Sequence, residues 1–211
     1  MSTIVQLFQN FTDEIDNLIQ FDSENQKLFS ARTVETAVGL RKRQLQMLTE
    51  SIFFSAYRAY ESFLRDIFLC YCLAEMTKSG QQVVSYLIPK DKTHAEQLIK
   101  SAMPFLDWTS PDTVIARSEI YLQDGFPVKL AYTANKQTLS DLKILRNHIA
   151  HNSNESLQNY LKVIKRHYTT VPLSIPTPGH FLLLSEKKNP NKYKLLTYLV
   201  FLKDIAIELI S

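Results

Sequence analysis

The chain contains little glycine, with four among its 211 residues, and no proline before Pro89. Glycine-rich phosphate loops need more closely spaced glycines than Gly39, Gly80, Gly125 and Gly179 provide, which excludes P-loop and Rossmann nucleotide sites. Scarce glycine also argues against all-β folds with many tight turns. Because proline interrupts helices and none occurs before Pro89, the first part of the chain is free to form long helices.

Cysteine occurs only twice, as Cys70 and Cys72. Because residues two apart on a helix point to different sides, this pair can neither share a metal ion nor easily form a disulfide. Such residues are typical of buried positions in a protein of a reducing compartment. No apolar run reaches the roughly 18–20 residues of a membrane helix, and the N-terminus lacks a secretory pattern. We therefore expect a cytoplasmic protein with no membrane partner.

Hydrophobic periodicity predicts an all-α fold, a helical bundle formed by a single domain over residues 1–211. A polar connection is expected at 22–30, an inserted helical and irregular excursion at about 80–134, and a loop or short hairpin at 171–190. Apolar residues recur every three or four positions in the predicted helices, which are 3–20, 32–78, 81–88, 91–102, 112–122, 138–151, 153–168 and 193–210.

Residues 142–152 carry the most chemical information. Asn147 and His151 are four apart and share one helix face, which Lys143 extends backwards, while the long side chain of Arg146 is expected to reach the same opening. Arginine can bind two phosphate oxygens, and histidine transfers protons near neutral pH. The group therefore suits a phosphodiester such as RNA, whose 2′-OH is its own nucleophile, with no metal or cofactor required. The alternative is a capping or solvated histidine beside a solvated arginine.

The same segment resembles the signature of HEPN domains, in which an arginine and a polar residue are followed by a short spacer and a histidine (R-x4–6-H). Arg146, Asn147 and His151 match its four-residue form. The stretch Tyr60-Glu61-Ser62-Phe63-Leu64-Arg65-Asp66-Ile67 also looks like the earlier core helix of bacterial HEPN proteins of the RNase-L-like group. The resemblance covers about 40–78 and 135–210, which would form the core of the domain.

This resemblance implies an up-and-down helical bundle that forms a homodimer, with the two motifs facing each other across one composite cleft. It also implies a metal-independent endoribonuclease, a toxin or antiviral-defence effector, with an antitoxin or defence-system protein as a further partner. His151 would act as general base or acid on the 2′-OH or the leaving 5′-oxygen. Arg146 would stabilise the charge on phosphorus, and Asn147 would orient the pair.

Two other functions remain open. One is a non-catalytic module that keeps the fold and binds a nucleotide or a protein in the cleft. The other is a structural helical partner of an antitoxin. The presence of both Arg146 and His151 favours the enzyme, because a scaffold does not need both at this spacing.

Supporting roles are predicted for further residues. Glu61 either joins an ion-pair ladder with Arg58 and Arg65 or holds Arg146 in position. Asn152 is expected to cap a helix C-terminus in preference to contacting RNA, and the neighbouring histidine at position 148 is expected to be a hydrogen-bonded structural residue. The formal net charge is +3, and the candidate phosphate-binding cations, which could equally form solvated helix faces, are Arg41, Lys42, Arg43, Lys162, Lys165 and Arg166.

Overall fold

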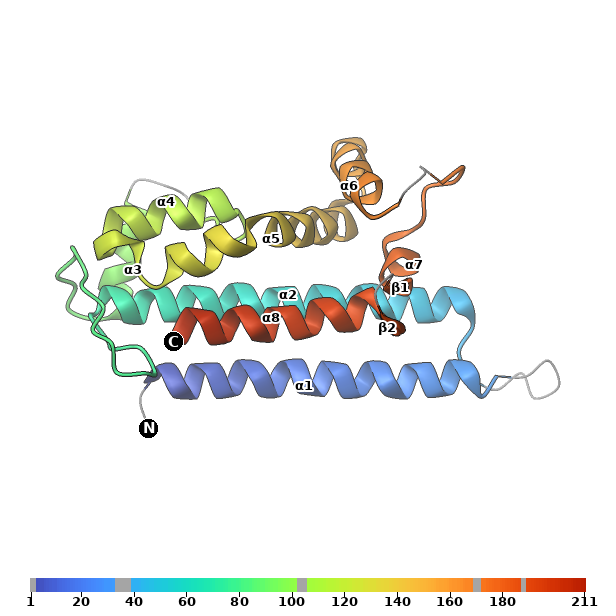
Figure 1. The fold of residues 1–211 in the computed structure, drawn as a ribbon, viewed down its shortest axis with the longest axis horizontal. Helices are drawn as coiled ribbons and strands as arrows, with labels where there is room; N and C mark the ends of the chain where they lie inside the picture. The colour runs from blue at the N-terminus through green and yellow to red at the C-terminus, as the bar shows by residue number, and fades with distance from the viewer. Residues whose placement is uncertain (1–2, 33–38, 102–105, 169–171, 187–188) are drawn as a thin grey trace. The chain divides into compact units, whose positions relative to one another are not determined.

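The computed structural model describes residues 3–32, 39–101, 106–168, 172–186 and 189–211, and the fold is all-α, as predicted. One two-stranded antiparallel sheet accompanies the helices in these residues. None of the helices described there combines the length and the apolar character that crossing a membrane requires. Figure 1 shows the elements, which are α1 (Thr3–Ser30), α2 (Lys42–Cys72), α3 (Lys92–Lys100), α4 (Pro111–Tyr121), η1 (Gln123–Gly125), α5 (Val128–His151), α6 (Asn154–His167), α7 (Pro178–Leu182), β1 (Ser185–Glu186), β2 (Asn189–Tyr193) and α8 (Lys194–Ile210).

The chain divides into two compact units. Unit 1 comprises Met1–Asp13, Ala59–Ser140 and Leu202–Ser211, and unit 2 comprises Glu14–Arg58 and Asp141–Phe201. Several of the long helices contribute residues to both units.

Aromatic side chains of α2 form much of the core of unit 1. Phe63 stacks on Phe11 of α1, with ring centroids 4.8 Å apart. Tyr60 donates a hydrogen bond from its hydroxyl to that of Tyr132 on α5 at 2.8 Å, and both residues are buried. Since the polar tips of these tyrosines find partners, their rings can be buried without an unsatisfied hydroxyl.

The inserted excursion of unit 1 contains α3 and α4 close to their predicted ranges, but the predicted helix at 81–88 is wrong. There the backbone forms no helix, and Ser85 forms an antiparallel bridge with Leu122. The Tyr86 amide donates to the Tyr121 carbonyl at 2.9 Å. These long-range backbone bonds compete with a local helix, and periodicity alone cannot reveal them.

Unit 2 contains the end of α1, which replaces the polar connection predicted at 22–30. The helix continues to Ser30 because two of its polar residues, Asp22 and Asn25, are themselves buried. Asp22 accepts a hydrogen bond from the Tyr193 hydroxyl at the end of β2. In the same unit Phe53 of α2 meets Tyr198 of α8 edge to face at 6.2 Å.

Several predicted boundaries also change. Helix α2 spans Lys42–Cys72 instead of 32–78, and residues 33–38 of the predicted helix lie outside the described residues. Its C-terminal end is followed by Ala74 in a left-handed conformation, with φ of 57°. Helix α5 begins at Val128, ten residues before its predicted start, directly after a proline that precedes the helix instead of breaking it. For 171–190 the hairpin alternative is confirmed in part, by β1 and β2, but Pro178–Leu182 forms helix α7 where a loop or hairpin was predicted. Residues 171, 187 and 188 lie outside the described residues.

Candidate functional site

The junction between α5 and α6 in unit 2 is short and well capped. Helix α5 ends at His151, and Asn152 follows in a left-handed conformation with φ of 42°. Its amide donates to the His148 carbonyl at 3.0 Å, so its predicted role at the helix C-terminus is confirmed. Ser153 then caps α6, accepting a hydrogen bond from the Ser156 amide at 3.2 Å in a capping box.

A hollow of about 300 Å³ opens at this junction, and we name it the junction hollow. Asn147 and His151 both line it, as expected for residues four apart on one helix face, and His151 is exposed. The hollow is therefore lined by an imidazole, two side-chain amides, two serine hydroxyls and a carboxylate. Its lining residues are Asn147, His151, Ser153, Glu155, Ser156 and Asn159.

Arg146 is connected to this group through Asn147. Its Nη1 donates to Asn147 Oδ1 at 3.0 Å. Its guanidinium carbon lies 5.5 Å from the centroid of the Phe54 ring on α2, a cation–π arrangement. Arg146 is not among the residues that line the junction hollow. Within one chain, the structure thus brings Asn147 and His151 into one opening and turns Arg146 toward Phe54.

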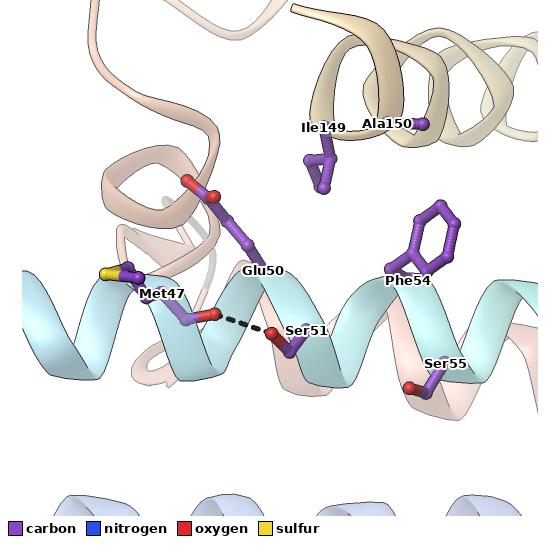
Figure 2. A pocket seen from close by; sticks show the side chains of 7 residues that line it. All are labelled: Met47, Glu50, Ser51, Phe54, Ser55, Ile149 and Ala150. Atoms are coloured by element: carbon purple, nitrogen blue, oxygen red, sulfur yellow. Dashed lines mark hydrogen bonds between the residues drawn. The ribbon is translucent and has the colours of Figure 1, made fainter.

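A second hollow of about 370 Å³ lies between α2 and the last turn of α5, and we name it the α2–α5 pocket. Figure 2 shows Ile149 at the end of α5 pointing toward α2, where Glu50 and Phe54 lie, with Ala150 at the next position of α5. Glu50 accepts a hydrogen bond from the Gly179 amide of α7 at 2.7 Å. Burial raises the pKa of the Glu50 carboxyl, and the Gly179 bond opposes that rise. The complete lining is Met47, Glu50, Ser51, Phe54, Ser55, Ile149 and Ala150.

His148 is the buried histidine of this region, as predicted. The residue is 6% exposed, and its ring stacks on Tyr160 of α6 at 4.8 Å between centroids. Its Nδ1 lies 2.9 Å from the Ser156 hydroxyl. The same hydroxyl lies 2.9 Å from the Ser153 carbonyl oxygen, and the tautomer of the imidazole decides which group donates in the bond between His148 and Ser156. Burial lowers the pKa of His148, which favours a neutral structural ring.

The supporting residues are divided between the units. Lys143 is half-buried on α5 in unit 2, whereas Glu61 and Arg65 are on α2 in unit 1. Arg65, expected in a ladder with Glu61, is instead paired with Asp66, with Nη2 and Oδ1 2.9 Å apart. A role for Glu61 in holding Arg146 stays a prediction.

The predicted phosphate-binding cations differ in their partners. Arg166 forms an ion pair with Asp141, whose side chain is only 9% exposed, with Nε and Oδ2 3.2 Å apart. Its charge thus compensates a buried carboxylate. Lys162 instead donates to Asn159 Oδ1 at 2.9 Å, which places its ammonium beside a residue of the junction hollow. The remaining members are exposed, and they are Arg41, Lys42, Arg43 and Lys165.

Sequence reasoning missed Glu50 and Phe54. Their spacing of four on one helix was visible, but it does not show which helix they face. The contact of Phe54 with Arg146 joins residues far apart in the chain. No group of three or more His, Cys, Asp or Glu side chains suited to a metal ion occurs within the described part of the chain.

Comparison of the chain with models of protein families, with curated proteins and with solved structures finds no match.

Proposed function

We propose that the protein is a metal-independent endoribonuclease that uses Arg146, Asn147 and His151. The observation that carries the proposal is the arrangement at the end of α5, where Asn147 bonds the Arg146 guanidinium and lines a solvent-open hollow with His151. An imidazole that is exposed beside an amide-held guanidinium offers proton transfer and charge stabilisation for one phosphodiester. The resemblance to HEPN ribonucleases supports the same chemistry.

In the proposed reaction, His151 takes the proton of an RNA 2′-OH. The 2′-oxygen then attacks the adjacent phosphorus, the bond from phosphorus to the 5′-oxygen breaks, and the departing oxygen receives a proton. The products are a 2′,3′-cyclic phosphate and a 5′-hydroxyl. Arg146 stabilises the additional negative charge on the phosphorus centre, and Asn147 positions the guanidinium.

A homodimer would complete this site. One chain turns Arg146 toward Phe54 and leaves His151 in the junction hollow. A second copy facing the same helix end would supply another Arg146 and another His151, so that one histidine acts as base and the other as acid. Dimers that combine one wild-type and one His151→Ala subunit test this division. Half of the wild-type activity would contradict it, because the proposal expects almost complete loss.

The second candidate is the non-catalytic binding module, in a toxin–antitoxin or defence complex. It is favoured by Glu155, whose carboxylate lines the junction hollow together with His151. A carboxylate there opposes the approach of a phosphate, since like charges repel. A binding module would retain its ligand with no cleavage at all.

The deciding experiment is cleavage of total cellular RNA in EDTA by wild type, Arg146→Ala and His151→Ala, with analysis of the product ends. We expect wild type to leave 2′,3′-cyclic or 3′-phosphate ends and both variants to lose at least about 100-fold in rate. Arg58→Ala and His94→Ala are the matched controls, because these residues lie outside the motif. Folded wild-type dimer that cuts no RNA would favour the binding module, and cleavage that survives in both motif variants would remove the proposed site.

A further inference from the structure

The α2–α5 pocket takes no part in the proposed proton transfer. Its volume of about 370 Å³ falls within the range of roughly 300–1,000 Å³ that small-molecule sites occupy. Met47, Phe54 and Ile149 give it apolar walls, and Glu50 contributes the charged group. Apolar walls with a small number of fixed polar groups are typical of a ligand site.

The Glu50 carboxylate is held in place by α7. The Gly179 amide donates to its Oε1 at 2.7 Å, and the residue is half-buried. A carboxylate offers about four lone-pair positions, so this one bond leaves acceptor capacity for a ligand. Because Glu50 is an acceptor when ionised, it selects ligands that present N–H or O–H donors.

A positive charge borders the same pocket. The Arg146 guanidinium carbon lies 5.5 Å from the ring centroid of Phe54, and Phe54 is part of the pocket wall. The pocket thus combines an acceptor, an aromatic ring and a neighbouring cation. A complementary ligand carries hydrogen-bond donors on a flat ring and an anionic group attached to it, which describes a nucleotide.

We infer that the α2–α5 pocket binds the base of a guanine nucleotide, with Glu50 accepting hydrogen bonds from the base and Arg146 facing its phosphate. Guanine presents two adjacent donors, N1–H and the N2 amine, to one carboxylate. Adenine, cytosine and uracil each place an acceptor next to a donor on that edge, which a carboxylate repels. The choice of an RNA nucleotide over other anionic ring compounds rests on the proposed function.

This arrangement would also select the cleavage site. Arg146 contacts Phe54 of the pocket and Asn147 of the junction hollow, so a guanosine held in the pocket would bring its own phosphate toward His151. We therefore expect cleavage next to guanosine.

The test is calorimetric binding of 5′-GMP, 5′-IMP and 5′-AMP to the full chain in EDTA. IMP lacks the N2 amine, and AMP presents an acceptor at N1. We expect GMP to bind roughly ten- to a hundredfold more tightly than AMP, as is typical of a bidentate base contact, with IMP between them. Equal affinities for the three nucleotides would overturn the inference. Comparable binding of phenethylamine would also overturn it, because the pocket would then be a general site for organic cations.

Glu50→Gln provides the matched variant. Glutamine keeps one oxygen for the Gly179 amide but replaces the other acceptor with a donor, so the preference for GMP over AMP should disappear. Glu14→Gln makes the same exchange at an exposed position of α1 and should leave the preference unchanged. Persistence of the preference in Glu50→Gln would overturn the inference. If thermal melting shows Glu50→Gln to be unfolded, the three nucleotides on wild type decide the matter alone.

The nuclease and the guanine pocket can fail separately. His151→Ala should lose cleavage and still prefer GMP. A GMP preference in a protein that cuts no RNA would retain the pocket and reject the nuclease. RNA cleavage with equal nucleotide affinities and no preferred base beside the cut would retain the nuclease and reject the pocket.

Discussion

The last turn of α5 contains two histidines with very different surroundings. His148 is buried, stacked on Tyr160 and bonded to Ser156, whereas His151, three residues later, is exposed in the junction hollow. Both side chains belong to the same helix end. Helix α6 borders both residues. Its Tyr160 and Ser156 contact the His148 ring directly, whereas its Glu155 and Asn159 line the open hollow at His151. At a helix end, the neighbouring element therefore determines whether a histidine is structural or available for chemistry.

The largest effect expected from this comparison is the loss of RNA cleavage when the exposed histidine, His151, is replaced. Replacing His151 with alanine should lower the rate of RNA cleavage by at least about 100-fold, because proton transfer to or from a positioned group contributes roughly 10²–10⁴. The free energy of unfolding should stay within about 0.5 kcal/mol of wild type, as is usual for an exposed side chain. Urea unfolding and single-turnover cleavage measure the two quantities. A strongly destabilised variant would mean that His151 is a packed residue like its neighbour.

Replacement of the buried histidine, His148, should have the opposite effect, lowering stability and leaving cleavage unchanged. His148→Ala removes a buried ring from Tyr160 and deprives the Ser156 hydroxyl of a partner, which should cost about 2–3 kcal/mol of stability. For a chain of this size, each kcal/mol corresponds to roughly 2–4 °C in the melting temperature. Cleavage per folded molecule should remain close to wild type. An unchanged melting temperature would contradict the structural role assigned to His148.

The pH dependence of stability sharpens the same contrast. Burial lowers the pKa of folded His148 below its ordinary 6.5, so at acidic pH the unfolded chain binds a proton that the folded protein excludes. This contribution to stability is complete above about pH 6.5 and is lost as the pH falls, by at most about 1.4 kcal/mol per unit.

The measurement is the difference in unfolding free energy between wild type and His148→Gln at pH 7.5, 6.5 and 5.5. The difference should shrink toward acidic pH. Contributions from the carboxyl groups of Asp22 and Glu50, whose pKa values burial raises, occur in both proteins and cancel. A difference that is constant across the range would show that His148 carries no such linkage.

The smallest expected effect concerns Ser153, at the junction between α5 and α6. Ser153 caps α6 and also lines the junction hollow. Ser153→Ala should lower the unfolding free energy by about 1 kcal/mol, the usual loss for an N-cap hydroxyl. Ser174→Ala, at an exposed position outside the helices, serves as the control in the same urea titrations. Equal losses in both variants would argue against the capping role.

Local signals predicted much of the helical structure. The cap at Ser153 and the apolar periodicity placed α6 and α8 almost to the residue. Periodicity did not predict the end of α1, because this part of the helix buries polar residues. The carboxylate of buried Asp22 is satisfied by a hydrogen bond from Tyr193, a residue distant in sequence. The helix predicted at 81–88 was wrong for a similar reason, since the backbone partners of this segment, Tyr121 and Leu122, lie at the end of α4 and directly after it.

In the candidate site, too, helical spacing predicted some features, and contacts between residues distant in sequence determined the others. Helical geometry alone placed Asn147 and His151 on one face, and they share the hollow. The direction of Arg146 could not be predicted, because it depends on contact with Phe54 of another helix. Glu50 was equally hidden, since its orientation follows from a hydrogen bond to a glycine 129 positions away.

Gly179 carries a consequence for how this protein can vary over evolutionary time. A Cβ atom at that position would lie 2.4 Å from the Gln46 carbonyl oxygen, closer than real structures permit. The main chains of α7 and α2 therefore meet with no space for any side chain. In a library of random variants, selection should retain glycine here whatever ligand the protein serves, and a survey of tolerated substitutions would mark the position as invariant. The cause of this invariance would be the close packing of two backbones. An analysis of sequence variation alone would wrongly assign a catalytic role to the position.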